Sequence, residues 1–184
     1  MNQLASIKQS DFADFERQGW EQLSTAYSES WGHVTSAFVP AILASFPELE
    51  GKQLIDLATG TGYAASIASR EGAIVTGIDF SVNMVVQARM AFPTIIFETA
   101  DVEALPFGDE TIEFSVSNFG FQHFQNPDKA LREVLRVLKP RGALGFTVWA
   151  EAHRNAASLI LEQALNRFAV VPCPIPEGPN YGEG

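Results

Sequence analysis

The chain has 184 residues, of which 46% are hydrophobic, so it is long enough for one domain with a sizeable core and short for two. Its 22 acidic and 12 basic residues give a formal charge of -10, which argues against nucleic acid as a partner because a polyanion is repelled at long range. The single cysteine, Cys173, cannot close an internal disulfide and offers no metal cluster. We expect a cytoplasmic protein without membrane insertion, since no apolar run is long enough to span a bilayer and the N-terminus lacks a signal-peptide pattern.

The first fifty residues indicate helices. Apolar and aromatic residues recur at helical spacing from Phe12 to Tyr27 and again from Trp31 to Phe46, and Pro40 predicts a kink in the second segment. Such a stripe is compatible with core packing, with a lid over a pocket or with a partner surface, and core packing is the first expectation because apolar stripes usually face a core. We expect residues 1–50 to form an N-terminal helical cap or lid.

From residue 51 to residue 169, strand-like and helix-like segments alternate, which is typical of a parallel sheet covered by helices. The expected strands are 54–57, 73–79, 94–97, 112–117 and 142–149, and the expected helices are 61–70, 81–91, 127–138 and 155–168. The sequence therefore predicts an α/β fold, a Rossmann-like doubly wound parallel sheet of about five strands with N-terminal helices.

The stretch Leu54–Ala65 joins a short apolar run to a turn that contains Gly60 and Gly62. Glycine lets backbone N–H groups approach a ligand, but a strand-to-helix turn needs it for steric reasons too, so the stretch alone fits a ligand loop and a structural turn equally well. Asp79 follows Gly60 by 19 positions, about where a dinucleotide fold places the carboxylate that binds ribose hydroxyls. An acid there rejects a ribose 2′-phosphate, so we expect an adenosine-like nucleoside as ligand.

Carboxylates stand near the ends of three successive expected strands, at Asp56, Asp79 and Asp101. Each one alone is more typical of a helix cap or a solvated loop, but together they favour a ligand site at the carboxyl edge of the sheet. Two ligand classes stay open. Gly60-x-Gly62-x-x-Ala65 satisfies the fingerprint of NAD- or FAD-type oxidoreductases, whereas Asp56 would repel a pyrophosphate and suits a ligand with positive charge.

Several motifs resemble those of the class I S-adenosylmethionine-dependent methyltransferases, particularly the branch of the ubiquinone and menaquinone C-methyltransferases. The resemblance runs from about Gln53 to Glu151. The matching segments, in chain order, are Asp56–Gly62 with Ala58 in place of the first motif glycine, Gly77–Ser81, Ala100–Phe107, Asn118–Phe124 and Leu131–Gly142.

The resemblance implies S-adenosylmethionine as cofactor and methyl transfer to oxygen or carbon of a small molecule. The implied cofactor contacts are Asp56 near the ammonium group, the backbone of Ala58, Thr59, Gly60 and Gly62 around the methionine part, Asp79 on the ribose, Phe80, Asp101 and Val102 at the adenine, and Asn118 and Phe119 beside the sulfonium. No metal site is expected. The chemistry needs little more than alignment of the acceptor with the methyl group in a dry pocket.

A general base is less clearly indicated. His123 follows the fourth expected strand and is the candidate, because an imidazole can take a proton near neutral pH, although a structural role is the alternative. His33 is an outside candidate for the pocket, and His153 is expected at the surface.

Residues 170–184 form a Pro- and Gly-rich tail, which we expect to be an extended linker of a truncated chain. We expect the sixth and seventh strands of the family fold to be missing, so that an exposed sheet edge could support a homodimer. Three alternatives to an active methyltransferase remain: a dinucleotide-binding oxidoreductase, a non-catalytic cofactor-binding module, and an inactive fragment of a methyltransferase.

Overall fold

A computed structural model describes residues 9–150 and the separate residues 154, 156, 159, 160, 163 and 167. The expected helix 155–168 falls mostly outside the described residues, and His153, Cys173 and the tail 170–184 fall wholly outside them.

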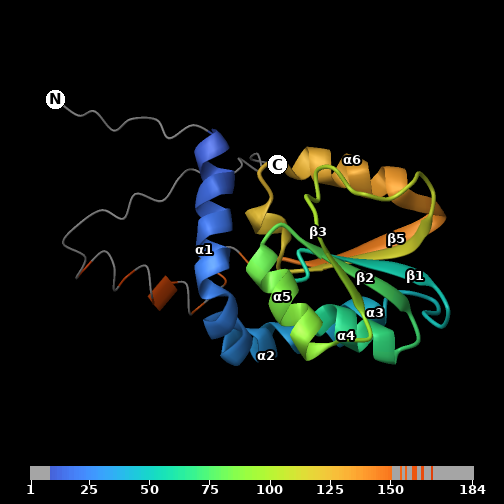
Figure 1. The fold of residues 1–184 in the computed structure, drawn as a ribbon, viewed down its shortest axis with the longest axis horizontal. Helices are drawn as coiled ribbons and strands as arrows, with labels where there is room; N and C mark the ends of the chain where they lie inside the picture. Colours follow the sequence, from blue (N-terminus) through green and yellow to red (C-terminus); the bar gives the residue numbers. More distant parts are fainter. Residues whose placement is uncertain are drawn as a thin grey trace.

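The described part of the chain contains a five-stranded sheet in which every neighbouring pair of strands is parallel (Figure 1). The strands are β1 (Gln53–Leu57), β2 (Ile74–Asp79), β3 (Ile96–Thr99), β4 (Ile112–Asn118) and β5 (Leu138–Thr147). Their order is β3-β2-β1-β4-β5, so the direction of winding reverses between β1 and β4. Ligands of open parallel sheets bind at such a reversal, beyond the carboxyl ends of the strands.

Helices cover both faces of this sheet and one of its ends. They are α1 (Gln9–Glu29), α2 (Trp31–Ser36), α3 (Val39–Leu43), α4 (Tyr63–Arg70), α5 (Val82–Ala91), the short 3-10 helix η1 (Phe121–His123) and α6 (Pro127–Val137). α1 contacts α2 and α5 and stands across the end of the sheet at which the strands finish (Figure 1).

Alternate residues of β1 supply two separate cores, as the two-residue period of a strand requires. Leu54 packs with α3, α4 and α5 on one face, whereas Ile55 and Leu57 pack with α6 on the other. All three are at most 1% exposed, which places β1 in the middle of the molecule and fixes the loop that follows it. The α/β doubly wound prediction is confirmed.

Two predicted elements differ from the structure by more than a shift of two residues. The segment 31–46 is two short helices, because the chain breaks at Ala37 and Phe38 and Pro40 then occupies the first turn of α3, where its missing N–H costs nothing. β5 begins at Leu138, four residues before the predicted Gly142, and the register of its pairing shifts between Ile112 and Phe114. Pro140 is tolerated there because β5 is an edge strand of the described sheet.

Among the described residues, no helix is both long and apolar enough to cross a membrane. The same part of the chain holds no cluster of three or more metal-ligating side chains.

Candidate active site

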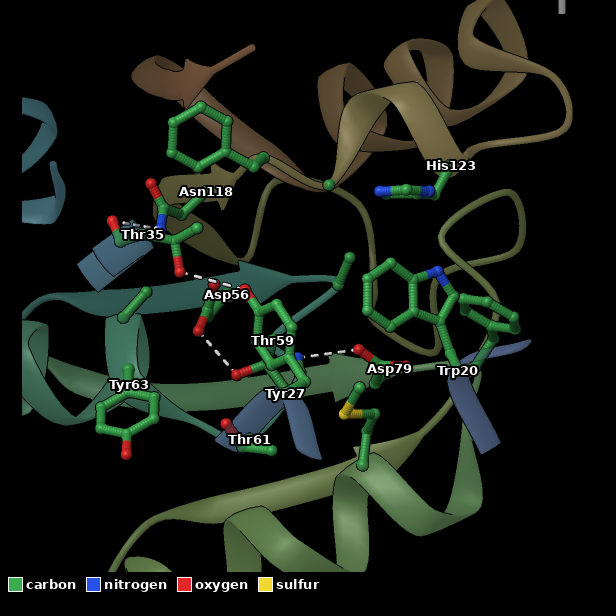
Figure 2. Close-up of a pocket in the computed structure, with 17 residues that line it drawn as sticks. Trp20, Tyr27, Thr35, Asp56, Thr59, Thr61, Tyr63, Asp79, Asn118 and His123 are labelled. Atoms are coloured by element: carbon green, nitrogen blue, oxygen red, sulfur yellow. Dashed lines mark hydrogen bonds between the residues drawn. The ribbon is translucent and has the colours of Figure 1, made fainter. Parts of the chain in front are cut away.

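Asp56 lies at the centre of the site, on β1, and is only 1% exposed. Its Oδ2 accepts a hydrogen bond from the Thr59 hydroxyl at 2.6 Å (Figure 2). It also accepts from the backbone N–H of Ala65, in the first turn of α4, at 2.9 Å. Its Oδ1 has no partner among the described residues. Burial raises the pKa of Asp56 from 3.8 to about 7, despite the two bonds that favour the carboxylate.

Asp79 ends β2 beside the glycine turn, as the 19-residue spacing predicts. Its Oδ2 accepts from the Gly60 N–H at 2.8 Å and its Oδ1 from the Ser81 N–H at 2.9 Å. The side chain is 4% exposed, and burial raises its pKa from 3.8 to about 6. The two buried carboxylates face one small space, which favours a cation or several hydroxyl donors as ligand.

The backbone around this space adopts conformations that are costly for ordinary residues. Gly60 and Gly62 have φ of 55° and 86°, and Ala58 and Phe119, which follow β1 and β4, have φ of 51° and 58°. A Cβ on Gly62 would lie 2.8 Å from the ring of Phe97. Such strain is concentrated at binding sites, where it turns backbone N–H groups toward a ligand. Ala58 therefore takes the left-handed position that a glycine more readily fills.

Asn118 is tied to both neighbouring elements. Its Nδ2 donates to the Thr35 carbonyl of α2 at 3.0 Å, and its Oδ1 accepts from the Thr147 hydroxyl of β5 at 2.8 Å. The Thr35 hydroxyl in turn pairs with the Tyr27 hydroxyl at 3.0 Å, and burial raises the pKa of Tyr27. The N-terminal helices are thus fastened to the strand ends through polar side chains.

The side chains of α1 close the space above the carboxylates. Trp20 and Tyr27 lie against Asp56, Asp79, Thr59 and the other residues of the site, with ring centroids 5.5 Å apart and planes at 88° (Figure 2). The remaining cavity is about 70 Å³, well below the several hundred Å³ of typical ligand pockets. A nucleoside ligand therefore requires these side chains, or α1 itself, to move outward.

A second small cavity, also about 70 Å³, continues the first beneath α1. The predicted adenine contacts Phe80, Asp101 and Val102 line it, together with Ala58 and His123, which both cavities share. The structure thus brings all the predicted cofactor residues except Gly62 onto two adjoining cavities, and Gly62 is the residue directly before α4.

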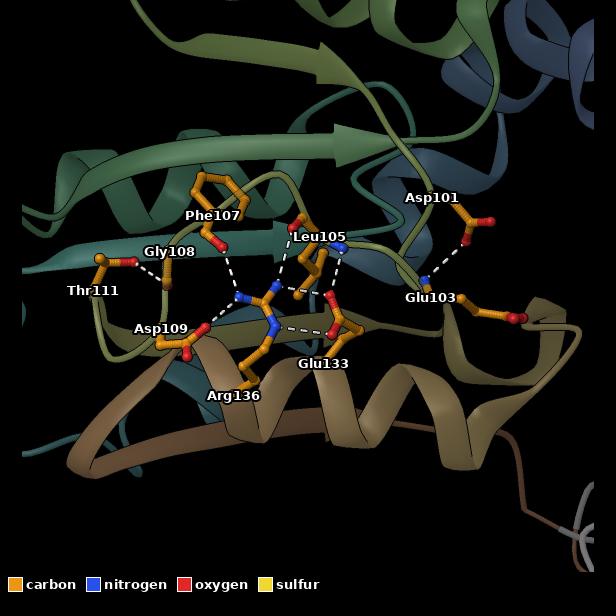
Figure 3. A network of polar contacts seen from close by, with 9 residues as sticks. All are labelled: Asp101, Glu103, Leu105, Phe107, Gly108, Asp109, Thr111, Glu133 and Arg136. Atoms are coloured by element: carbon orange, nitrogen blue, oxygen red, sulfur yellow. Dashed lines mark hydrogen bonds and ion pairs between the residues drawn. The ribbon is translucent and has the colours of Figure 1, made fainter.

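Hydrogen bonds from Arg136 of α6 hold the loop that supplies Asp101 and Val102 (Figure 3). The guanidinium donates to the carbonyls of Phe107 and Leu105, at 2.8 and 3.1 Å, and to both oxygens of Glu133. Glu133 also accepts from the Leu105 N–H at 2.9 Å. The hydrogen bonds from Arg136 lower the pKa of Glu133. A planar, five-donor side chain is required for this set of bonds.

A larger, open cavity of about 490 Å³ adjoins the first and is mainly aromatic. Residues from α1, α2, η1 and the ends of β4 and β5 line it, among them Trp20, Tyr27, Trp31, Phe119, His123 and Trp149. Phe119 and Trp149 stack, with ring centroids 4.2 Å apart. This size and composition suit a flat apolar small molecule.

His123 lies at the junction of all three cavities, and its Nδ1 is 2.6 Å from Oε2 of Glu16 on α1. The other predicted histidine, His33, lines none of these cavities and contacts the Tyr63 hydroxyl at 3.4 Å. His33 therefore lies behind Tyr63, which lines the first cavity, and does not itself line any of the three cavities.

Sequence reasoning expected a cap formed by the N-terminal helices, but it did not identify the residues through which these helices enter the site. Thr35 accepts from Asn118 at the end of β4, and Glu16 contacts His123 of η1, which is 107 residues away along the chain. Trp20 and Tyr27 line the cavity beside them. The only sequence signal is the aromatic stripe, which is equally typical of core packing. Because Leu23 and Trp31 are 53% and 54% exposed, that stripe is in part a cavity wall and not only core.

The residues present fit the cofactor that the sequence resemblance implies. A buried carboxylate oxygen without a partner, Oδ1 of Asp56, suits an ammonium group, which supplies several donors and a positive charge. The second acid, Asp79, is placed where ribose hydroxyls are bound in related folds. A pyrophosphate would face two carboxylates here, so the dinucleotide alternative fits the site poorly.

Comparison with known proteins gives the following matches. The family described as "Methyltransferase domain" matches residues 55–146. The chain is 40% identical over 113 residues to a demethylmenaquinone methyltransferase of Chlorobaculum tepidum, covering 59% of this chain and 46% of that protein.

Among solved structures, an S-adenosylmethionine-dependent methyltransferase from Mesorhizobium loti is 30% identical with a TM-score of 0.56, covering 61% of this chain and 53% of that one. The cyclase SpnF is 31% identical with a TM-score of 0.57, covering 61% of this chain and 44% of that one. The chain spans about half the length, or less, of the curated relatives it matches.

Proposed function

This chain belongs to the methyltransferase-domain family, in the ubiquinone and menaquinone branch of the class I S-adenosylmethionine-dependent methyltransferases, and on that premise we propose that it transfers a methyl group from S-adenosylmethionine to oxygen or carbon of a small molecule. The observation that supports this most strongly is the unpartnered, buried Oδ1 of Asp56 beside a second buried acid, Asp79, at the point where the winding of the sheet reverses. S-adenosylmethionine is the cofactor of this domain.

In this proposal Asp56 receives the cofactor's ammonium group. The strained backbone from Ala58 to Gly62 surrounds the methionine part, because its left-handed residues turn N–H groups toward the cavity. Asp79 binds the ribose hydroxyls with the lone pairs that remain after its bonds to Gly60 and Ser81.

The adenine lies in the second cavity. Asp101 accepts from its amino group, the Val102 N–H donates to a ring nitrogen, and Phe80 covers one face, since all three residues line this cavity. Asn118 and Phe119, at the end of β4, lie beside the sulfonium, where the first cavity meets the aromatic one.

The acceptor occupies the aromatic cavity of about 490 Å³, which shares Trp20, Phe119 and His123 with the cofactor cavities. The cofactor supplies a methyl group bound to a positively charged sulfur. The contribution of the chain is to align the acceptor with that methyl group and to exclude water from the contact. His123 is the general base in this proposal, because it borders both ligands.

Three further features complete the proposal. Residues 1–50 act as a cap whose α1 opens to admit the cofactor, as the small volume of the two cavities under α1 suggests. The protein works in the cytoplasm, in keeping with its single cysteine. It can form a homodimer through β5, one of the two outer strands of the described sheet, which size-exclusion chromatography would reveal.

A labelled-methyl assay tests the proposed activity. The protein is incubated with methyl-tritiated S-adenosylmethionine and a panel of phenols, quinols and carboxylic acids, and we expect transfer of label to at least one acceptor with stoichiometric S-adenosylhomocysteine. Binding of S-adenosylhomocysteine without transfer to any acceptor would favour a non-catalytic module, an outcome made reasonable by the cyclase among the matched folds. Binding of NAD or FAD in place of S-adenosylhomocysteine would refute the proposal.

A further inference from the structure

Glu16 of α1 contacts the candidate base directly, although the two residues are 107 positions apart. The carboxylate Oε2 lies 2.6 Å from Nδ1 of His123, and the two side chains are 15% and 24% exposed. The same oxygen accepts from Nε1 of Trp20 at 2.9 Å. The Trp20 ring stands edge-on to the imidazole (Figure 2), with centroids 5.0 Å apart and planes at 85°. Two residues of α1, Glu16 and Trp20, therefore hold the imidazole in place.

These contacts define which nitrogen of His123 carries its hydrogen. An ionised carboxylate only accepts hydrogen bonds, so Nδ1 is the protonated nitrogen. On the other side of the ring, the amide nitrogen of Gln122 lies 3.3 Å from Nε2, and an amide nitrogen only donates. Nε2 therefore holds a lone pair, at the edge of the aromatic cavity that His123 and Gln122 both line.

We propose that Glu16 is a positioning residue that holds His123 as a base, with Nε2 presented to a ring hydroxyl of an acceptor in the aromatic cavity. This inference rests on the proposed function and narrows it to planar, hydroxyl-bearing acceptors of the phenol or enol type. A hydroxyl donor replaces the long contact from Gln122, and the aromatic walls hold the ring.

The proton and electron balance of the step is complete without a further reactant. The hydroxyl proton moves to Nε2 and later to solvent, the acceptor oxygen forms a bond to the methyl carbon, and the carbon–sulfur bond breaks with its electron pair going to sulfur. Glu16 stabilises the imidazolium that results, because a carboxylate on Nδ1 favours the charged ring.

If the Glu16–His123 pair had a purely structural role, it would only attach α1 to η1. However, α1 has a second attachment that does not involve His123: Glu21 accepts from the backbone N–H groups of Val82 and Asn83, at 2.7 and 3.1 Å, at the start of α5. Its own backbone carbonyl also accepts from the Asn83 side chain at 2.9 Å. Glu21→Gln is therefore a matched control, since it weakens the docking of α1 and leaves the pair intact.

The test uses 4-nitrophenol, whose anion has its own absorption band, and 4-nitroanisole, which has the same shape without the proton. Both are titrated into the wild type, Glu16→Gln and Glu21→Gln, with and without S-adenosylhomocysteine. We expect the wild type to bind 4-nitrophenol as its anion at a pH where the free phenol is neutral. Glu16→Gln should lower the bound anion fraction by about tenfold or more, since a positioned base contributes factors of that order, whereas Glu21→Gln should keep it.

The affinity for 4-nitroanisole should stay within about twofold in both variants, because the cavity walls are unchanged. An unchanged anion signal in Glu16→Gln, an equal loss in Glu21→Gln, loss of 4-nitroanisole binding in Glu16→Gln, or no binding to the wild type would each overturn the inference. Failure of the wild type to bind S-adenosylhomocysteine, measured separately by calorimetry, would instead refute the proposed function.

Discussion

Replacement of Asp56 by Asn is expected to stabilise the ligand-free protein at alkaline pH while it removes the cofactor's charge partner. The side-chain oxygen of Asn can still accept from Thr59 and Ala65, so the two existing bonds are kept. The amide cannot ionise, however. The variant therefore escapes the cost of a buried negative charge that the wild type bears.

The magnitude follows from the pKa of Asp56. Its value in the folded protein, about 7, exceeds the ordinary 3.8, so the folded state binds the proton more tightly than the unfolded chain. The contribution of Asp56 to the free energy of unfolding is therefore largest below about pH 4, and it is lost as the pH rises to about 7. At about 1.4 kcal/mol per pKa unit the full loss is about 4 kcal/mol, of which about 2 to 3 kcal/mol falls between pH 5 and pH 8.

Urea denaturation of both proteins at pH 5 and pH 8 measures this directly. The stability advantage of Asp56→Asn should be larger at pH 8 by about 2 to 3 kcal/mol. Asp128→Asn, at an exposed site in the first turn of α6, serves as the control and should change stability by less than about 0.5 kcal/mol at either pH. An advantage that is equal at the two pH values, or smaller at pH 8, would refute the reasoning.

Three other predictions concern the same site. Affinity for S-adenosylhomocysteine should fall by up to about tenfold per pH unit below pH 7, because Asp56, with a pKa of about 7, must lose its proton to face an ammonium group. Calorimetry in buffers of different ionisation enthalpy should show that binding releases a proton, and proton uptake would contradict this prediction. Gly62→Ala should lower the free energy of unfolding by at least about 1 to 2 kcal/mol, since φ is 86° and the new Cβ would meet the Phe97 ring. Gly19 lies within α1 with open space around it, so Gly19→Ala should instead raise the free energy of unfolding by about 0.5 to 1 kcal/mol. Arg136→Lys should speed hydrogen exchange at the Leu105 N–H by about tenfold or more, because an ammonium cannot replace the contacts that the guanidinium makes to Glu133 and two carbonyls. An unchanged exchange rate would mean that the loop keeps its conformation without Arg136.

The parts of the site that follow β1 and β2 could be predicted because their geometry is local. A short buried strand, a glycine turn, one helix and one further strand consume a fixed length of chain, which puts Asp79 beside Gly60 whatever the rest of the sequence does. The same reasoning located Asn118 at the end of β4, since parallel strands finish at one edge.

The individual residues that cover that site could not be predicted, because they are placed by contacts between distant segments. Nothing in the spacing of Trp20 or Tyr27 distinguishes a residue that faces a core from one that closes a cavity. The left-handed conformations of Ala58 and Phe119 could not be predicted from the sequence either, since neither is a residue type that favours positive φ. The early start of β5 follows from its pairing with Ile112, again a contact made in the fold and not along the chain.

The most direct test of the proposed cofactor site is a calorimetric titration of S-adenosylhomocysteine into the wild type and into Asp79→Ala, with Glu98→Ala, an exposed acid on β3, as the control. Asp79 is expected to hold the ribose through charge-assisted hydrogen bonds, so its loss should weaken binding by about 2 kcal/mol or more, about 30-fold in Kd, while the control binds as the wild type does. Equal affinity of the wild type and Asp79→Ala, or no binding to either, would contradict the assignment of this edge of the sheet as the cofactor site.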